Sequence, residues 1–235
     1  MSRLLALAWL FAIPAIAAPP APAKTARVSV LYFDVQSTQE ALKVFNKGLS
    51  ELMIADLAQS TDLTVVERSR LEEILAELKL GETRYADPAT AAKIGKLVGA
   101  QFMVAGTIVE NPVLSAKGGP GRFKLLVKII DVEHATVVPQ STIKVDLDPD
   151  DVFGAEEAVV KEIAKFLVTA GKAKQAGEPA KKAHKLPVGT AVKYSKALDA
   201  KDKKNKDQAV KLLNEVVKEQ PDFKLAQLDL LTLTK

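Results

Sequence analysis

The chain has no cysteine and only two histidines among its 235 residues. Without cysteine the protein forms no disulfide, and it has no thiol to carry the lipid of a bacterial lipoprotein. The isolated His134 and His184 leave almost no ligands for zinc, so we expect neither a metal site nor a bound cofactor. Stability must come from the hydrophobic core, and 48% hydrophobic with 26% charged residues is a composition typical of folded proteins.

Long apolar runs are scarce as well. The run over residues 4–16 is broken by Pro14. It is too short for a membrane anchor, the alternative interpretation, which needs about 20 residues. A basic start, Met1-Ser2-Arg3, and a small–x–small site, Ala15-Ile16-Ala17, predict a cleaved secretory signal peptide over residues 1–17. We therefore expect an exported, periplasmic protein, either free or associated with the outer membrane, with a Pro/Ala-rich leader over residues 18–26.

Charge is unevenly distributed, although the net charge is only +4. Residues 27–170 carry an acidic excess, whereas residues 171–187 and 188–235 are basic. A basic tail can bind nucleic acid or anionic lipid, or it can be a solvated linker. Export argues against nucleic acid, and residues 171–187 lack hydrophobic periodicity, so we expect them to form a flexible linker. Contact between this linker and lipid stays open.

Hydrophobic periodicity divides residues 27–170 into strands and helices. Apolar runs predict strands over 27–33, 63–66, 101–109, 122–131 and 136–147, and Pro139 marks an edge or a bulge in the last. Stripes at spacings of three and four predict helices over 40–60, 69–80, 88–98 and 151–170. Asp87-Pro88 and either Asp150 or Asp151 supply N-caps. The order βαβααβββα predicts an α/β sandwich, a mixed sheet with helices mainly on one face.

No arrangement of residues indicates catalysis. Asp34 follows the first strand, where α/β ligands often bind, but a turn-forming aspartate is the simpler interpretation. The serines Ser50, Ser69 and Ser115 lack the context of a nucleophile elbow. The turn Gly118-Gly119-Pro120-Gly121 joins two strands and lacks the Lys-Ser/Thr of a phosphate-binding loop. We expect no catalytic residues and no enzyme.

A highly charged stretch, Glu67-Arg68-Ser69-Arg70, lies where a predicted strand meets a predicted helix. Ser69 and Glu72 stand at the spacing of a capping box, in which a hydroxyl and a carboxylate each bond a free backbone amide. We therefore interpret the stretch as the start of a helix, with no catalytic or phosphate-binding role.

Residues 27–170 resemble the CsgG/HfaB family of curli-secretion components. The resemblance rests on the segments VSVLYFDVQS, GLSELMIADLAQSTDLTVVERSRLEEILAELKL, DPATAAKIGKLVGAQFMVAGTIVE and IIDVEHATVV. It implies an α/β periplasmic domain that mediates assembly without enzymatic activity. The family's pores are lipoproteins that insert β-hairpins into the outer membrane. This chain lacks the cysteine, and residues 111–121 and 133–135 are too short for spanning strands of about 9–11 residues, so we expect no pore built from this chain alone.

Residues 188–235 form a small all-α segment that resembles a tetratricopeptide repeat. Its second helix follows the spacing of that repeat at Ala209, Leu213, Val216 and Pro221. A single repeat cannot bury its apolar face alone, so the segment must dock on the first domain, on a second copy or on a partner. We expect an exposed groove around Tyr194, Leu198 and Lys201 to bind a protein partner.

These features predict a non-enzymatic interaction or assembly protein of the bacterial periplasm. The CsgG-like domain would oligomerise or dock, and the helical tail would bind a partner. The alternative is a soluble accessory subunit of a curli-like secretion channel in the outer membrane. Both functions imply protein partners in the cell envelope and allow a homo-oligomer. Neither involves nucleic acid or a membrane-spanning segment in the mature chain.

Overall fold

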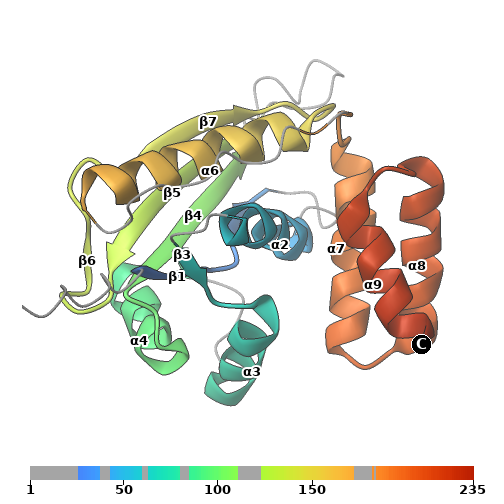
Figure 1. Ribbon diagram of the computed structural model, residues 1–235, viewed down its shortest axis with the longest axis horizontal. Coiled ribbons are helices and arrows are strands. Elements are labelled where there is room, and N and C mark those ends of the chain that lie inside the picture. Colours follow the sequence, from blue (N-terminus) through green and yellow to red (C-terminus); the bar gives the residue numbers. More distant parts are fainter. Residues whose placement is uncertain are drawn as a thin grey trace, which may run out of the picture.

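A computed structural model describes residues 26–37, 43–59, 63–79, 85–110, 123–171, 182 and 184–235. The predicted signal peptide, almost all of the leader, Ser115, the turn at 118–121 and most of the predicted linker lie outside these residues. The described part contains an α/β domain followed by three C-terminal helices (Figure 1).

Seven strands form one mixed sheet. They are β1 (Ala26–Val30), β2 (Asp34–Gln36), β3 (Leu63–Val65), β4 (Phe102–Glu110), β5 (Phe123–Asp131), β6 (Thr136–Val137) and β7 (Ile143–Leu147). The central order is β3-β1-β4-β5-β6, with β2 beside β4 and β7 beside β5. β1 runs parallel to both β3 and β4, whereas β5 is antiparallel to β4, β6 and β7. The predicted mixed sheet and antiparallel meander are therefore confirmed.

Helices cover both faces of the sheet, which corrects the expectation that they lie mainly on one. The four in the α/β domain are α2 (Phe45–Ala58), α3 (Arg68–Leu78), α4 (Pro88–Val98) and α6 (Val152–Thr169). α2 and α6 contribute to one buried apolar cluster, whereas α3 and α4 contribute to a second (Figure 1). Alternation along β4 explains the two clusters, because Val104 belongs to the first and its neighbours Met103 and Ala105 to the second.

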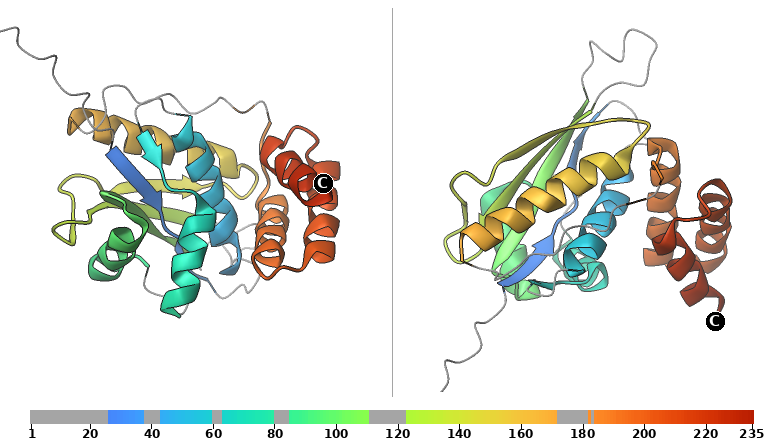
Figure 2. Two further views of the ribbon diagram at one scale, coloured as in Figure 1. Left: turned by 60° about the horizontal axis from the view of Figure 1, so that its bottom comes forward. Right: turned by 45° about the horizontal axis from the view of Figure 1, so that its top comes forward.

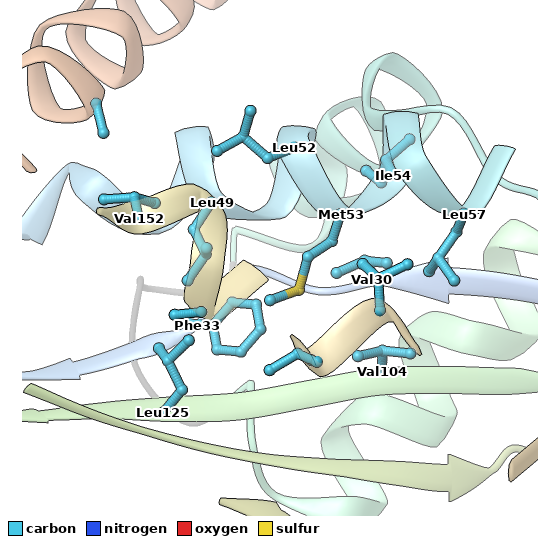
Figure 3. Close-up of a cluster of buried hydrophobic side chains, with 14 of the residues drawn as sticks. Val30, Phe33, Leu49, Leu52, Met53, Ile54, Leu57, Val104, Leu125 and Val152 are labelled. Carbon is cyan, nitrogen blue, oxygen red and sulfur yellow. The ribbon is translucent and has the colours of Figure 1, made fainter. Parts of the chain in front are cut away.

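The larger cluster lies between α2 and the sheet. Figure 3 shows Leu49, Met53 and Leu57 pointing from α2 toward Val30 of β1 and Val104 of β4. The spacing of three and four that predicted this helix therefore marks the face that is buried. On α4 the same expectation holds for Ile94 but is wrong for Leu97, whose exposed fraction is 47%.

One short strand, β2, was not predicted, and one predicted strand is interrupted. Asp34, interpreted as a turn residue, begins β2, and its carboxylate accepts hydrogen bonds from the amides of Tyr85 and Ala86 at 3.0 and 3.2 Å. The predicted third strand of the meander is divided into β6 and β7, with Pro139 between them. Proline has no amide hydrogen to donate to a ladder, which accounts for the interruption.

The three C-terminal helices are α7 (Val188–Asp202), α8 (Lys206–Glu219) and α9 (Lys224–Thr234). α7 packs directly on α2, and α8 and α9 lie beyond it (Figures 1 and 2). At the contact, the Ser195 hydroxyl accepts a hydrogen bond from the Gly48 amide at 3.0 Å and donates one to the Ala191 carbonyl at 2.8 Å. A Cβ atom at residue 48 would lie 2.1 Å from the Ser195 Oγ, so this close approach requires glycine.

Candidate functional site

The three residues predicted to line an exposed groove lie mostly inside the molecule. Tyr194 and Leu198 are fully buried and belong to the cluster that also contains Phe45 and Leu49 of α2. Lys201 is partly exposed and pairs with Asp229 of α9. The expectation of an open groove at these residues is therefore wrong, because α2 and α9 of the same chain cover the apolar stripe.

Tyr194 connects α7 to the last helix. Its hydroxyl donates a hydrogen bond to Asp229 at 2.9 Å, and its ring meets Phe223 edge-on with the ring centres 4.8 Å apart. Burial, followed by the nearby charge of Asp229, raises the pKa of the tyrosine well above its ordinary value. The phenol therefore stays protonated and acts as a structural donor.

Arg68 joins the α/β domain to the C-terminal helices through a buried ion pair. Its guanidinium donates two hydrogen bonds to the carboxylate of Asp202, at 2.8 and 2.9 Å, and a third to the Tyr32 hydroxyl at 3.2 Å. Its Nε lies 3.1 Å from a carboxylate oxygen of Glu51. The side chain is only 7% exposed, and a buried arginine needs such a set of acceptors.

Lys47 is a second buried cation next to Arg68, and it binds the same carboxylate of Asp202. Its ammonium lies 3.0 Å from Asp202, 3.1 Å from Asp199 and 3.3 Å from Glu72. Glu72 also accepts a hydrogen bond from the Tyr32 hydroxyl. Two cations thus face four carboxylates, and the surplus of negative charge keeps both cations ionised. We call this group the tail cluster; its charged members are Lys47, Glu51, Arg68, Glu72, Asp199 and Asp202.

The pKa shifts in the tail cluster follow from burial and pairing. Burial lowers the pKa of Lys47, but the carboxylates of Asp202 and Glu72 outweigh it and the net direction is upward. Burial likewise opposes the charge of Arg68, yet its hydrogen bond to Asp202 raises the pKa above its ordinary value. Burial raises the pKa of Glu51 and, with smaller contributions from Glu72, that of Tyr32.

The tail cluster lies where α/β folds commonly bind ligands. Tyr32 follows the carboxyl end of β1, and Lys47 and Arg68 stand in the first turns of α2 and α3. The amino ends of helices favour negative charge, and two cations add to that preference. In this protein Asp199 and Asp202 from the end of α7 supply the negative charge. The charged groups at this end of the sheet therefore hold the C-terminal helices.

The charged stretch at 67–70 starts a helix, as predicted, but the predicted capping box is wrong. α3 begins at Arg68, with Glu67 as N-cap and no side-chain capping bond. The Ser69 hydroxyl donates to Glu67 at 3.4 Å. Glu72 accepts from Tyr32 and Lys47 and does not return to the backbone. Glu72 therefore binds partners from other elements in place of the capping contact that its spacing from Ser69 predicted.

A second buried ionic group holds the segment that leads into α7. The Lys182 ammonium pairs with Asp56 of α2 at 2.7 Å and with Glu156 of α6, and it lies 4.6 Å from the centre of the Phe153 ring. Glu156 is completely buried, and burial raises its pKa to about 8 despite the nearby lysine. Downstream, the Val152 amide donates to the carbonyl of Leu186 at 2.8 Å, which fixes the start of the tail.

Ser50 and the two histidines each contact groups of the same chain. Ser50 donates to the Leu31 carbonyl at 2.8 Å inside the core. His134 lies 3.1 Å from Asp131, and His184 lies 2.7 Å from Asp222, both near the surface. Among the residues that the structure describes, no three acidic or histidine side chains are placed to hold a metal ion. None of the described helices has the length and apolar character needed to cross a membrane.

Two hollows lie on the surface of the described part. One lies between the edge strand β7 and the end of α6, lined by residues that include Ser141, Lys144 and Phe166. The other lies between α8 and α9 and is lined by Asn214, Gln227, Leu230, Leu231 and Thr234. The second lies on the face of the tail that the α/β domain leaves uncovered, which makes it the candidate interaction surface.

Sequence reasoning missed both ionic groups and the α8–α9 surface. The signal for Arg68 was its place among four polar or charged residues at a helix start, but nothing there identified Asp202 as its partner. In the sequence, Leu228 and Leu231 stood out only as members of the predicted all-α segment over residues 188–235. Their exposure depends on how that helix packs, which periodicity alone does not specify.

Residues 12–148 match one family model, described as curli production assembly/transport component CsgG.

Among solved structures, the C-terminal domain of LpoB from Salmonella enterica is 16% identical, with a TM-score of 0.38. The match covers 53% of this chain and 84% of that chain. Lipoprotein GNA1162 from Neisseria meningitidis is 13% identical, with a TM-score of 0.39 and coverages of 62% and 93%. The PelC dodecamer from Paraburkholderia phytofirmans is 14% identical, with a TM-score of 0.31 and coverages of 67% and 93%. These distant likenesses carry no information on function. Among curated protein sequences, none matches the chain.

Proposed function

This chain belongs to the CsgG family of curli production assembly/transport components, and we propose that it is a non-enzymatic assembly protein of the bacterial periplasm. In this proposal the α/β domain docks or oligomerises at an envelope assembly, and the C-terminal helices bind a protein partner. The family match ends at residue 148, before α6 and the C-terminal helices.

The observation that carries the proposal is the way the tail is fixed. The bidentate pair between Arg68 and Asp202 and the contact between Ser195 and Gly48 join α7 to the α/β domain through buried groups. A helical segment held in this manner presents α8 and α9 in a fixed orientation, at the side of the molecule away from the sheet (Figure 1). A rigid platform loses little conformational entropy when a partner binds, which suits an assembly protein.

Cell fractionation of the full-length protein tests this function. We expect release by osmotic shock and co-purification with at least one envelope protein after crosslinking. Retention in the cytoplasm would contradict the proposal. Size-exclusion chromatography with light scattering, in the absence of detergent, then distinguishes a monomer or dimer from a ring-sized oligomer.

A soluble accessory subunit of an outer-membrane secretion channel is the second candidate, because the matched family is described as an assembly/transport component. That function predicts stable co-fractionation with outer membranes and a dependence on a second protein that supplies the membrane strands. Free release by osmotic shock would argue for the first candidate instead.

A further inference from the structure

The last helix exposes two large apolar side chains on one face. Leu228 and Leu231 of α9 are 59% and 56% exposed, the highest values among the large apolar residues that the structure describes. Residues three apart on a helix are neighbours on its surface. Single exposed leucines are common on soluble proteins, so the pair alone would mean little. Leu231, however, lines the groove between α8 and α9, and Leu228 is its neighbour one turn earlier on the helix.

The groove is lined by both apolar and polar side chains. Leu230 and Leu231 supply apolar surface, and Asn214, Gln227 and Thr234 supply amide and hydroxyl groups. Its volume is about 410 Å³. The Asn214 amide nitrogen donates to the Val210 carbonyl at 2.9 Å. The Asn214 side chain is therefore held by its own helix.

Lysines surround this surface. On α9, Lys224 and Lys235 continue the line of Leu228 and Leu231 at helical spacing. On α8, Lys211 and Lys218 stand three residues before and four residues after Asn214, on the same face. All four lysines are exposed, and within the described part of the chain none of them lies in an ion pair.

Three acidic residues of the same helices face α7, whereas Asp207 of α8 is exposed on the same line as Lys211 and Lys218. Glu219 of α8 pairs with Lys193 and accepts a hydrogen bond from Thr190, both on α7. Asp229 of α9 pairs with Lys201 and Tyr194, also on α7. Because Glu219 and Asp229 bind α7, the outer face of α8 and α9 retains a surplus of positive charge, with four exposed lysines against the carboxylate of Asp207. The excess of lysines around the α8–α9 groove is thus a consequence of how α8 and α9 pack on α7.

We infer that the α8–α9 groove binds an amphipathic helix of a partner protein, with apolar residues that enter the groove and aspartates or glutamates that face the lysines. Helix-in-groove recognition uses apolar anchors spaced by three and four residues. Charge complementarity at the rim adds specificity and speeds association. This inference rests on the proposed function and specifies the chemistry of its partner.

Two other occupants fit the surface less well. A second copy of the chain, docked through the same face, would bring the four lysines against themselves, and like charges across an interface disfavour binding. An anionic membrane would attract the lysines and accept the leucines. Its acyl chains would not, however, offer hydrogen bonds to the side-chain oxygens of Asn214 and Gln227, whose amide nitrogens already donate to backbone carbonyls.

Site-specific photocrosslinking in the native host identifies the occupant. A photoreactive p-benzoylphenylalanine replaces Leu228 or Leu231 in the full-length protein, and the same residue at Leu97, a 47% exposed leucine on α4, is the matched control. We expect both α9 positions, and not position 97, to capture one envelope protein. Mass spectrometry should place the crosslink in a segment with the pattern of an acidic amphipathic helix.

Binding of that segment as a synthetic peptide to purified protein gives the quantitative test. We expect Leu231→Ser to weaken binding at least tenfold and Lys218→Glu to weaken it severalfold, with a loss of salt dependence for the charge change. Lys165→Glu on α6 makes the same charge change away from the groove and should leave the affinity unaltered.

Each other outcome overturns the inference. Crosslinks between two copies would assign the surface to self-association, and capture of lipid, with binding to phosphatidylglycerol vesicles that Leu231→Ser abolishes, would assign it to a membrane. A captured segment without acidic residues would remove the role of the lysines. Capture of an envelope protein only through the α/β domain would leave the proposed function intact while excluding this groove.

Discussion

Arg68 and Asp202 are 134 residues apart in sequence, and they form a two-point hydrogen-bonded ion pair with distances of 2.8 and 2.9 Å. Arg68 begins α3 and Asp202 ends α7, so the pair joins the α/β domain to the C-terminal helices. Their side chains are only 7% and 11% exposed. Burial makes the pair sensitive to the loss of either partner, because the remaining charge is left desolvated.

The pair predicts a large effect for Asp202→Ala. The change leaves the buried guanidinium of Arg68 without its bidentate acceptor, and we expect the free energy of unfolding to fall by about 3 kcal/mol. Asp199→Ala is the matched control. Asp199 is more exposed, at 21%, and binds only lysines, so its loss should cost about 1 kcal/mol or less. Equal losses in urea denaturation of the two variants would show that Asp202 holds the tail no more firmly than its neighbour.

The contact between α2 and α7 predicts non-additive substitutions. Gly48→Ala places a Cβ 2.1 Å from the Ser195 Oγ and should destabilise the protein by about 1–3 kcal/mol, despite the better helix propensity of alanine. Ser195→Ala removes a buried hydroxyl and should cost about 1 kcal/mol. The double variant should cost less than the sum, because the nearest remaining atoms lie 3.3 Å away.

A matched control for the Gly48→Ala substitution exists at the start of α7. Gly189 has no atom within 4 Å of an added Cβ, so Gly189→Ala should be neutral or slightly stabilising. If Gly48→Ala behaved like Gly189→Ala, or if the double variant showed simple additivity, the close packing of α7 on α2 would be contradicted.

The sequence was sufficient for features that depend on local spacing. The stripe Leu49, Leu52, Met53 and Leu57 predicted the buried face of α2, because helix geometry places residues three and four apart on one side. The cap at Asp87 is confirmed by its hydrogen bond from the Thr90 amide at 2.8 Å. Asp151 likewise accepts from the Gly154 amide at 3.2 Å, which decides between the two caps expected for α6.

The candidate site could not be predicted from local spacing, because it depends on contacts between segments that are distant in the sequence. The apolar stripe around Tyr194 and Leu198 was identified correctly, but its spacing could not show that α2 and α9 cover it. Arg68 was assigned to local capping chemistry since its partner, Asp202, lies in a different helix. Periodicity specifies which face of a helix is apolar, and tertiary packing decides what that face meets.

The N-termini of α4 and α3 allow a test of whether a side-chain cap or tertiary contacts stabilise the start of each helix. Asp87 caps α4 with a hydrogen bond to the Thr90 amide, so Asp87→Ala should lower the midpoint of thermal unfolding measurably. Ser69 makes no capping bond at the start of α3, so Ser69→Ala should leave the midpoint within experimental error. A larger loss for Ser69→Ala than for Asp87→Ala would restore the capping box at α3.

The buried Glu156 predicts a particular pH dependence of stability. Burial raises the pKa of its carboxyl from 4.5 to about 8, so the native state binds a proton that the unfolded state releases at lower pH. The contribution of this group to stability is fully present below about pH 4.5 and is lost as the pH rises through about 8. Stability of the wild-type protein should therefore decline across this range.

Glu156→Gln removes that titration and keeps the shape of the side chain. Lys182 still has Asp56 at 2.7 Å as an ionic partner, so the segment before α7 stays attached. Relative to wild type, the variant should gain on the order of 2–4 kcal/mol of unfolding free energy between pH 5 and pH 9, since each unit of pKa shift corresponds to about 1.4 kcal/mol. Urea denaturation at pH 5, 7 and 9 measures this, with Glu162→Gln, at an exposed position of the same helix, as the control. Curves for wild type and Glu156→Gln that stay parallel across pH would mean that Glu156 is ionised in the native state and that the pair with Lys182 outweighs its burial.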